Sequence, residues 1–561
     1  MLKNHPPGLF VAFFANMGER FGYYTMLSIF TLFLQAKYGY TVAEATNVFG
    51  IFLAAVYFMP LLGGIIADRF LGYGKTISIG LVVMFAGYML MAYPTAMDAG
   101  PTLIFVALGV VSLGTGLFKG NLQALVGNLY DDAKYSNVRD IAFNIFYMGI
   151  NIGAMFAPTA AEYVSNLVLS GKNFVYHAEI PALAHKFLEG DRSVEARLTE
   201  LAHAQPAAFT SLEAFSRDYI NALSESYHYA FGVACISLVV SMLVFWLMRK
   251  YYKQADMTET QKQKSADHKD QVVELTPEQT RARLGALFLV FLVVIFFWMA
   301  FHQNGAAMTI FARDYTVATV GKYTNILFDL FGLLPVFLSV LGLLFLVRRS
   351  STTLVRVIGL VAFIGFGIFA YFRISGYSDV NEFSPQKFQH FNPFFIVVLT
   401  PIVVGIFGWL AKRNKEPSAP KKIGIGMVIT AIGFTVLAIG SLSLVGYSPG
   451  EIGEIQPPEN LLVSPWWLIN TYFILTVAEL FLSPMGISFV SKVAPPKHKG
   501  LMQGGWFAAT AVGNYAAGLM GHFWAEVQLW VFWSILVTCC LLSAVFIFSI
   551  LKRLEKATAD I

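Results

Sequence analysis

The chain has 561 residues, of which 56% are hydrophobic and 13% are charged. Because an ordinary soluble domain is about one quarter charged, this composition excludes a soluble globular protein and indicates a polytopic membrane protein. The formal net charge of +5 is small for this length, so the positions of the basic residues are more informative than their sum.

Helices of about 20 apolar residues are the expected spanning form, because a backbone in lipid must satisfy its own hydrogen bonds. The N-terminus lacks a short apolar segment with a small-residue cleavage motif, so no removable signal peptide is expected. We therefore predict an all-α fold with fourteen spans, at about residues 8–35, 43–66, 76–95, 101–122, 139–163, 227–248, 284–312, 323–347, 353–375, 391–411, 423–446, 465–490, 500–524 and 528–551.

Lysine and arginine residues collect in the loops on one side of this arrangement, whereas the opposite loops at 96–100 and 447–464 carry none. Since short basic loops stay in the cytoplasm, both termini, the 249–283 linker and the 552–561 tail are predicted to be cytoplasmic. Residues 166–226 then form an extracytoplasmic insertion. Two capping-box patterns predict helix starts in the polar segments: "TPEQ" from Thr276, with Pro277 at the first helical position, and "TSLEAF" from Thr210.

Five ionisable residues lie inside predicted spans: Glu19, Arg20, Lys119, His302 and Glu479. Such residues are rare in spans and usually face a bundle interior or a water-filled cavity. Successive helix residues diverge by about 100°, so we expect Glu19 to pair with Lys119 rather than with Arg20. Glu479 is then the distant counter-charge for Arg20 or for the amine of a ligand. These groups either lock the bundle as ion pairs or line a hydrated cavity, and their number and mixed sign favour the cavity.

Several motifs fall on these polar positions. They are "ERFGYY" (19–24), "GGIIADRFLGYGKT" (63–76), "FKGNLQALVGNLY" (118–130), "FYMGINIGA" (146–154), "FNPFFI" (391–396), "AELFLSPMGISFVSKVAP" (478–495) and "QGGWF" (503–507). With these motifs, nearly the whole chain resembles the proton-coupled oligopeptide transporter (POT) family of the major facilitator superfamily.

The resemblance implies two six-helix halves around a central site that opens alternately to each side. The N-terminal half would be 1–248 and the C-terminal half 284–551. Two surplus helices would form a lateral, lipid-facing hairpin at 323–375, which is not the position between the halves where bacterial members of the family often carry an extra pair.

The sequence departs from the family pattern at three positions. Asn16 replaces the first glutamate of the first-helix motif, Leu27 replaces an arginine just beyond it, and His302 replaces a seventh-helix glutamate that takes part in proton coupling in the family. Histidine changes charge near physiological pH, so His302 either substitutes for a missing carboxylate or serves as a neutral ligand-binding imidazole.

The resemblance implies a symporter that imports di- and tripeptides with protons by alternating access. Glu479, Asn151 and Asn392 would hold the peptide amino terminus, and Arg20 and Lys119 its carboxylate. The other expected substrate-binding residues are Tyr24, Tyr57, Ser483 and Trp506, and the expected proton-coupling residues are Glu19, Arg20, Lys119 and His302.

Two other functions remain open: transport of nitrate or another small anion, and a receptor that does not transport. An enzyme is not expected, because the sequence lacks metal-ligand spacing, a nucleophile motif and an extended glycine-rich phosphate loop. Cys235, Cys539 and Cys540 lie in apolar stretches, so neither a disulfide framework nor a metal site is expected. We expect no cofactor besides the coupling proton, no nucleic-acid partner, a functional monomer, and a multi-pass location in a lipid bilayer, here a bacterial inner membrane.

Overall fold

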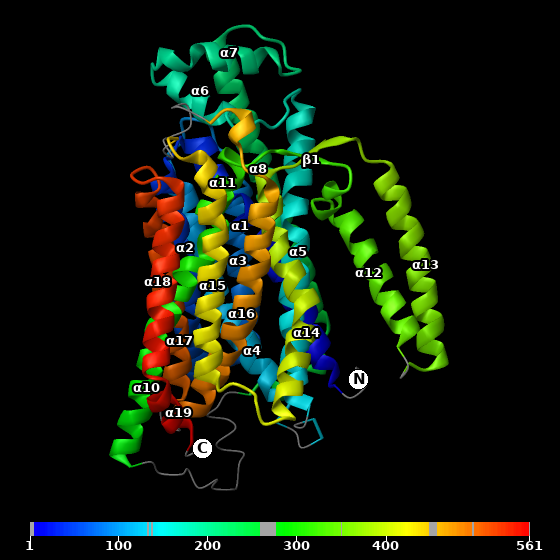
Figure 1. The fold of residues 1–561 in the computed structure, drawn as a ribbon, viewed down its shortest axis with the longest axis vertical. Helices are drawn as coiled ribbons and strands as arrows, with labels where there is room; N and C mark the ends of the chain where they lie inside the picture. Colours follow the sequence, from blue (N-terminus) through cyan, green and yellow to red (C-terminus); the bar gives the residue numbers. More distant parts are fainter. Residues whose placement is uncertain are drawn as a thin grey trace.

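A computed structural model describes residues 5–131, 134–135, 138–257, 276–348, 351–447, 457–495 and 499–559. The fold is a bundle of long, roughly parallel helices with a small helical cap at one end (Figure 1). The first part of the chain forms α1 (Pro7–Tyr38), α2 (Val42–Ile66), the π-helical turn η2 (Ala67–Leu71), α3 (Tyr73–Ala92), α4 (Thr102–Asn128), α5 (Arg139–Gly171), α6 (Ile180–Leu188), α7 (Glu195–His203) and α8 (Leu212–Leu247).

The second part begins with α10 (Pro277–Phe301), a 3-10 turn η7 (His302–Gly305) and α11 (Ala307–Asp314). It continues with α12 (Leu330–Val347), α13 (Thr353–Ser375), the 3-10 segment η9 (Pro385–His390), α14 (Phe391–Ala411), α15 (Ala419–Gly440), α16 (Pro465–Val493), α17 (Lys499–Leu519), α18 (Leu529–Ser549) and α19 (Leu551–Ala559). Two short strands, β1 (Thr319–Gly321) and β2 (Val380–Glu382), pair antiparallel beside α12 and α13.

Within the described residues, twelve helices are long and apolar enough to cross a membrane. All fourteen predicted spans coincide with long helices, and α1 and α17 are the two outside this set. Both pack among the others, α1 along α5 and α8, and α17 along α2 and α10. They are more polar, since α1 carries Glu19 and Arg20 and α17 is rich in glycine and alanine. The all-α, multi-pass prediction is thus confirmed.

Both chain termini lie at the end of the bundle opposite α6 and α7 (Figure 1). We call these two ends the termini end and the cap end. The predicted helix start at Thr276 is present as a capping box, in which Gln279 N–H donates to Thr276 Oγ1 at 3.2 Å and Thr276 N–H donates to Gln279 Oε1 at 3.1 Å.

The helices that flank the predicted insertion are longer than the predicted spans. Helix α5 continues to Gly171 and α8 starts at Leu212, whereas the predicted spans ended at 163 and began at 227. The polar ends of both helices extend beyond the apolar stretch on which the prediction relied. The N-cap of α8 is Ser211, whose side chain accepts from Ala214 N–H, rather than Thr210.

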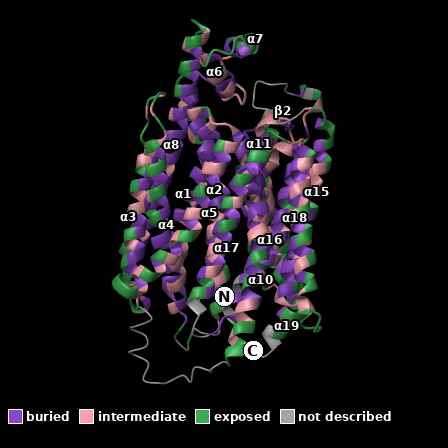
Figure 2. Cartoon of the chain, turned by 90° about the vertical axis from the view of Figure 1, so that its left-hand side faces the viewer, coloured by how far each residue is buried: buried purple, intermediate pink, exposed green. Residues whose placement is uncertain are grey.

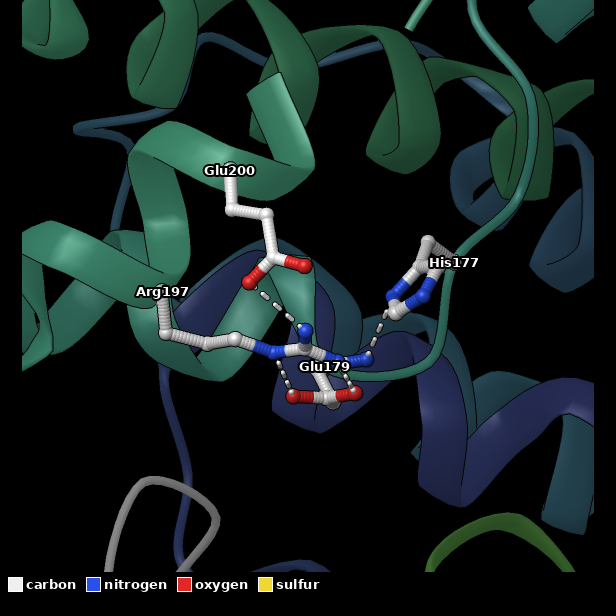
Figure 3. Close-up of polar contacts among 4 residues, drawn as sticks. All are labelled: His177, Glu179, Arg197 and Glu200. Carbon is white, nitrogen blue, oxygen red and sulfur yellow. Dashed lines mark hydrogen bonds and ion pairs between the residues drawn. The ribbon is translucent and has the colours of Figure 1, made fainter. Parts of the chain in front are cut away.

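The cap is held together by a cluster of charged residues (Figure 3). Arg197 of α7 binds Glu179 with two hydrogen bonds of 2.9 and 3.1 Å and binds Glu200 at 2.9 Å. His177 Nδ1 accepts the Glu179 backbone N–H at 3.3 Å. A bidentate arginine–carboxylate pair fixes direction as well as distance, so this cluster sets the position of α7 relative to the start of α6.

The bundle has two main hydrophobic cores, one on each side (Figure 2). The first joins α1–α5 and α8, and the second joins α10, α15, α16, α17 and α18. The two halves meet mainly where α2 packs on α17 and α5 packs on α14. Gly50 of α2 and Gly518 of α17 permit the first contact, because a Cβ on Gly50 would lie 2.7 Å from the Gly518 Cα.

Helices α12 and α13 form a hairpin beside the bundle, as predicted for the surplus pair (Figure 1). Only 11% of the most apolar stretch of α13 is buried. Ser339 Oγ donates to the Phe363 carbonyl at 2.9 Å and links the two helices. Apolar residues exposed on nearly every side suit a helix surrounded by lipid.

Candidate functional site

Glu19 and Arg20 form an ion pair in the middle of α1. Arg20 Nε donates to Glu19 Oε2 at 2.5 Å and Arg20 Nη2 donates to Oε1 at 2.6 Å. Both side chains are almost fully buried. The predicted Glu19–Lys119 pair is therefore wrong, and so is the expectation that adjacent helix residues cannot pair. The long arginine side chain curls back far enough to overcome the divergence at Cα.

Lys119 of α4 lies over an aromatic ring. Its Nζ is 3.6 Å from the centroid of the Tyr57 ring on α2, a distance that allows a cation–π interaction. Among the described residues, no carboxylate lies within 4.0 Å of this ammonium group. The structure thus leaves Lys119 without an anionic partner at the centre of the N-terminal half.

His302 also lies beside Tyr57, and the centroids of the two rings are 6.2 Å apart. It is the first residue of η7, where the seventh span breaks, and its ring stacks on Trp298 with centroids 5.1 Å apart. Its Nδ1 is buried and has no hydrogen-bond partner among the described protein atoms. His302 is therefore a buried imidazole that contacts Tyr57 from the C-terminal half.

The break that positions His302 leaves backbone carbonyls without helical partners. The Asn304 carbonyl accepts from Tyr472 Oη at 3.1 Å and from Thr309 Oγ1 at 2.9 Å. The Gly305 carbonyl accepts from Thr31 Oγ1 of α1 at 3.4 Å. Hydroxyl groups thus stabilise a discontinuous helix at the boundary between the halves, a feature common at transporter sites.

Glu479 of α16 is the buried carboxylate on the opposite side, with 7% of the residue exposed. Asn392 Nδ2 of α14 donates to Oε2 at 2.9 Å, and Tyr147 Oη of α5 donates to Oε1 at 3.3 Å. Asn392 also donates to Thr476 Oγ1 at 3.1 Å. The predicted association of Asn392 with Glu479 is present, and the tyrosine bond joins the two halves.

Tyr147 was absent from the predicted site, although it lies within the quoted "FYMGINIGA" motif. It precedes Asn151 by four residues and therefore shares its helix face. The Asn151 side chain donates to the Tyr147 carbonyl at 3.0 Å rather than to Glu479. The four-residue spacing was the signal in the sequence that could have revealed Tyr147.

The remaining predicted residues line the same region. Trp506 of α17 is buried against Gly486, where a Cβ would lie 1.8 Å from the indole ring. Ser483 follows Glu479 by one helical turn and is partly exposed. The partly exposed Tyr24 ring is 5.2 Å from Tyr23, centroid to centroid.

The two halves supply opposite signs of charge to the site, apart from Glu19, which is paired with Arg20 inside the N-terminal half. The N-terminal half supplies Arg20 and Lys119, and the C-terminal half supplies Glu479 and the neutral amide Asn392. Within the described residues, no group of three histidine, cysteine, aspartate or glutamate side chains is arranged to hold a metal ion. The arrangement can bind a ligand that carries both signs of charge.

Comparisons with known proteins identify transporters that are similar to this chain. The chain is similar to the peptide transporter YePEPT of Yersinia enterocolitica, with 27% identity over 92% of this chain and 88% of the relative. It is also similar to dipeptide and tripeptide permease B of Xenorhabdus bovienii, with 25% identity over 92% and 86%. Among solved structures, peptide transporter POT in complex with sulfate aligns with a TM-score of 0.66 at 21% identity, over 99% of this chain and 96% of that one.

The model of the POT family matches residues 74–267 and 368–532, which together are well over half of the chain. These relatives are transporters and permeases, in agreement with the prediction that the chain is not an enzyme. The twelve candidate membrane-spanning helices among the described residues and this match identify an integral, multi-pass membrane protein. The chain belongs to the POT family.

Proposed function

We propose that this protein is a proton-coupled symporter that imports di- and tripeptides by alternating access. The main supporting observation is the pairing of Glu479 with donors from both halves, opposite the positive groups Arg20 and Lys119. The peptide relatives and POT structures support the same substrate class.

The charges suit the two ends of a peptide. Glu479 would bind the amino terminus, because its oxygens accept hydrogen bonds from two described residues, the neutral donors Asn392 and Tyr147. Lys119 would bind the carboxylate, since it has no anionic partner among the described residues. If the site binds both ends of the peptide, the peptide side chains contribute little to recognition. We therefore expect broad selectivity among peptides.

The Glu19–Arg20 pair supports a coupling scheme different from one based on the predicted Glu19–Lys119 pair. A proton on Glu19 would break its bond to Arg20 and release the guanidinium group, rather than Lys119, toward the substrate carboxylate. A proton can drive transport only if it binds the alternating states with different affinity. His302 would contribute through its contact with Tyr57 across the two halves.

Transport of nitrate or another small anion is the alternative that the positive groups permit. Glu479 argues against transport of an anion, because its buried carboxylate would repel an anionic ligand. Competition separates the two: unlabelled dialanine should inhibit uptake of labelled dialanine, and the same concentration of nitrate should not.

Counterflow into liposomes tests the peptide site. We expect wild-type protein to exchange labelled dialanine and Glu479→Gln to lose about tenfold or more in apparent affinity, since a hydrogen bond to a charged group contributes about 1.5–3 kcal/mol. Glu526→Gln, which alters an exposed carboxylate, is the matched control and should transport normally. An absence of exchange in the wild type, or unchanged exchange by Glu479→Gln, would contradict the proposal.

A further inference from the structure

A cavity lies at the cap end, where α6 covers the turn between α1 and α2. Its volume is about 80 Å³, and its walls come from α1, α6, α8 and α11 together with the segment that leads into α6. A water molecule occupies about 10–15 Å³ by this measure, so the cavity has room for about five to eight water-sized groups. That space matches the backbone of one amino acid or one end of a dipeptide.

The floor of the cavity is a buried ion pair in α11. Arg313 Nε donates to Asp314 Oδ1 at 2.6 Å and Nη2 donates to Oδ2 at 2.9 Å, and the two side chains are 6% and 7% exposed. Arg313 Nη1 also donates to Gln35 Oε1 of α1 at 2.8 Å. These buried polar groups belong to both halves of the bundle.

The lining of the cavity includes two charges of opposite sign at the end of α6. Lys186 in its last turn and the C-cap residue Glu189 are three residues apart, and both line the cavity. Among the described residues, neither is within ion-pair distance, 4.0 Å, of an opposite charge. The wall beside them is closed where His185 Nε2 and the Ala36 carbonyl form a 2.9 Å hydrogen bond.

We propose that this cavity is a second binding site, for the zwitterionic end groups of an amino acid or a short peptide. Lys186 binds the carboxylate and Glu189 the ammonium group, while the Arg313–Asp314 pair faces the ligand as a fixed dipole. The walls add the aromatic side chains Tyr176 and Tyr227. The ligand class rests on the proposed function, whereas the site itself rests on the cavity and its charges.

Protection of an introduced cysteine tests this site. The variant Ala182→Cys places a thiol on the α6 wall, in a chain whose three native cysteines are replaced and whose central site carries Glu479→Gln. The rate of modification by N-ethylmaleimide is measured in nanodiscs with alanine, with dialanine, with ethylammonium acetate and with glycerol.

At about ten times Kd, mass action leaves about one tenth of the sites empty, so we expect roughly tenfold slower modification with alanine or dialanine. The separate ions and glycerol should protect much less, because they lack the joined charges. Lys186→Gln and Glu189→Gln should each abolish protection. Ala196→Cys on α7, outside the cavity, is the matched control and should be modified at the same rate with every solute.

No protection, equal protection by glycerol, or protection that survives both the Lys186 and the Glu189 substitutions would overturn the proposal. The test is independent of transport. If dialanine protects but does not enter liposomes, the transport function is wrong and the second site stands. If dialanine is transported but does not protect, only the second site is wrong.

Discussion

Single residues at the centre of the bundle hold charge in three different ways. Arg20 forms an ion pair with its chain neighbour Glu19, and Lys119 lies over an aromatic ring. Glu479 accepts hydrogen bonds from two neutral donors. A buried charge must be paired or hydrogen-bonded to be tolerated. Among the described residues, Lys119 and Glu479 have no ion-pair partner, and the two ends of a zwitterion would supply one to each.

Tyr147→Phe tests the bond between the halves at this site. Removing the hydroxyl deletes one donor to Glu479, so we expect peptide affinity to fall about two- to tenfold, corresponding to about 0.5–1.5 kcal/mol. Tyr163→Phe on the same helix alters an exposed side chain and should leave the Kd unchanged. A Kd that does not differ between the two variants in equilibrium binding of dialanine would contradict this role.

Gly486→Ala tests the packing of the site tryptophan. The added methyl group would lie 1.8 Å from the Trp506 ring, so we expect a loss of stability of about 1–3 kcal/mol, measured as a lower Tm in detergent. Gly109→Ala on α4, where a Cβ meets nothing within 4 Å, is the control and should not lower the Tm. Equal Tm values for both variants would show that Trp506 moves aside freely.

The candidate site was largely predictable from residue types, because ionisable groups inside apolar spans are few and conspicuous. Their pairing was not predictable. Whether Glu19 turns to Arg20 or to Lys119 depends on side-chain torsions and on the position of Tyr57, which sequence spacing does not reveal.

At the scale of elements, the spans were predictable from apolar length, whereas their polar extensions were not. The prediction ended the fifth span at 163 and began the sixth at 227, although both helices continue into the cap. The apolar sequence ends where the helix would leave the lipid, but the helical hydrogen bonds continue into the polar residues beyond it. The break at His302–Gly305 was missed for a related reason, because the surrounding sequence remains apolar.

The cap should weaken at low pH. Burial lowers the pKa of His177, and the neighbouring Glu179 only partly offsets this effect. Burial also lowers the pKa of His185, against the opposing effect of its bond to the Ala36 carbonyl. The unfolded cap then binds more protons than the folded cap, so the stability present above about pH 6.5 is lost as the pH falls toward the folded pKa values.

Hydrogen exchange measures this effect on α6. After correction for the chemical exchange rate, protection of α6 should fall between pH 7.5 and pH 5, and the double variant His177→Gln/His185→Gln should lose most of that dependence. Protection of α3, which lies in the bundle, provides the internal control. A pH response of α6 that is the same in wild type and double variant would exclude these histidines as its cause.

At the scale of the whole molecule, polar contacts join the two halves at the cap end. Lys387 Nζ of η9 is 2.9 Å from Glu162 Oε2 of α5, Gln389 Nε2 of η9 donates to the Ser28 carbonyl of α1 at 3.2 Å, and Arg313 binds Gln35. Alternating access requires such contacts to form and break as the halves rock against each other. We expect these contacts to break when the bundle opens at the cap end.

Lys387→Met should therefore favour opening at the cap end. Loss of about 1 kcal/mol shifts a two-state equilibrium about fivefold, and spin labels at the exposed positions Tyr93 and Tyr323 should report a larger share of long distances. Arg217→Met, which breaks an exposed pair within α8, is the matched control and should leave the distribution unchanged. Identical distributions for Lys387→Met and wild type would contradict a closing role for this pair.

Under the proposed function, proton flow drives peptide import through this bundle. Purified protein in liposomes should accumulate labelled dialanine above the external concentration when the outside is made acidic, and a protonophore should abolish that accumulation. Glu19→Gln should retain exchange of dialanine while losing gradient-driven accumulation. Uptake by the wild type that never exceeds equilibrium, or that is unaffected by the protonophore, would contradict the account.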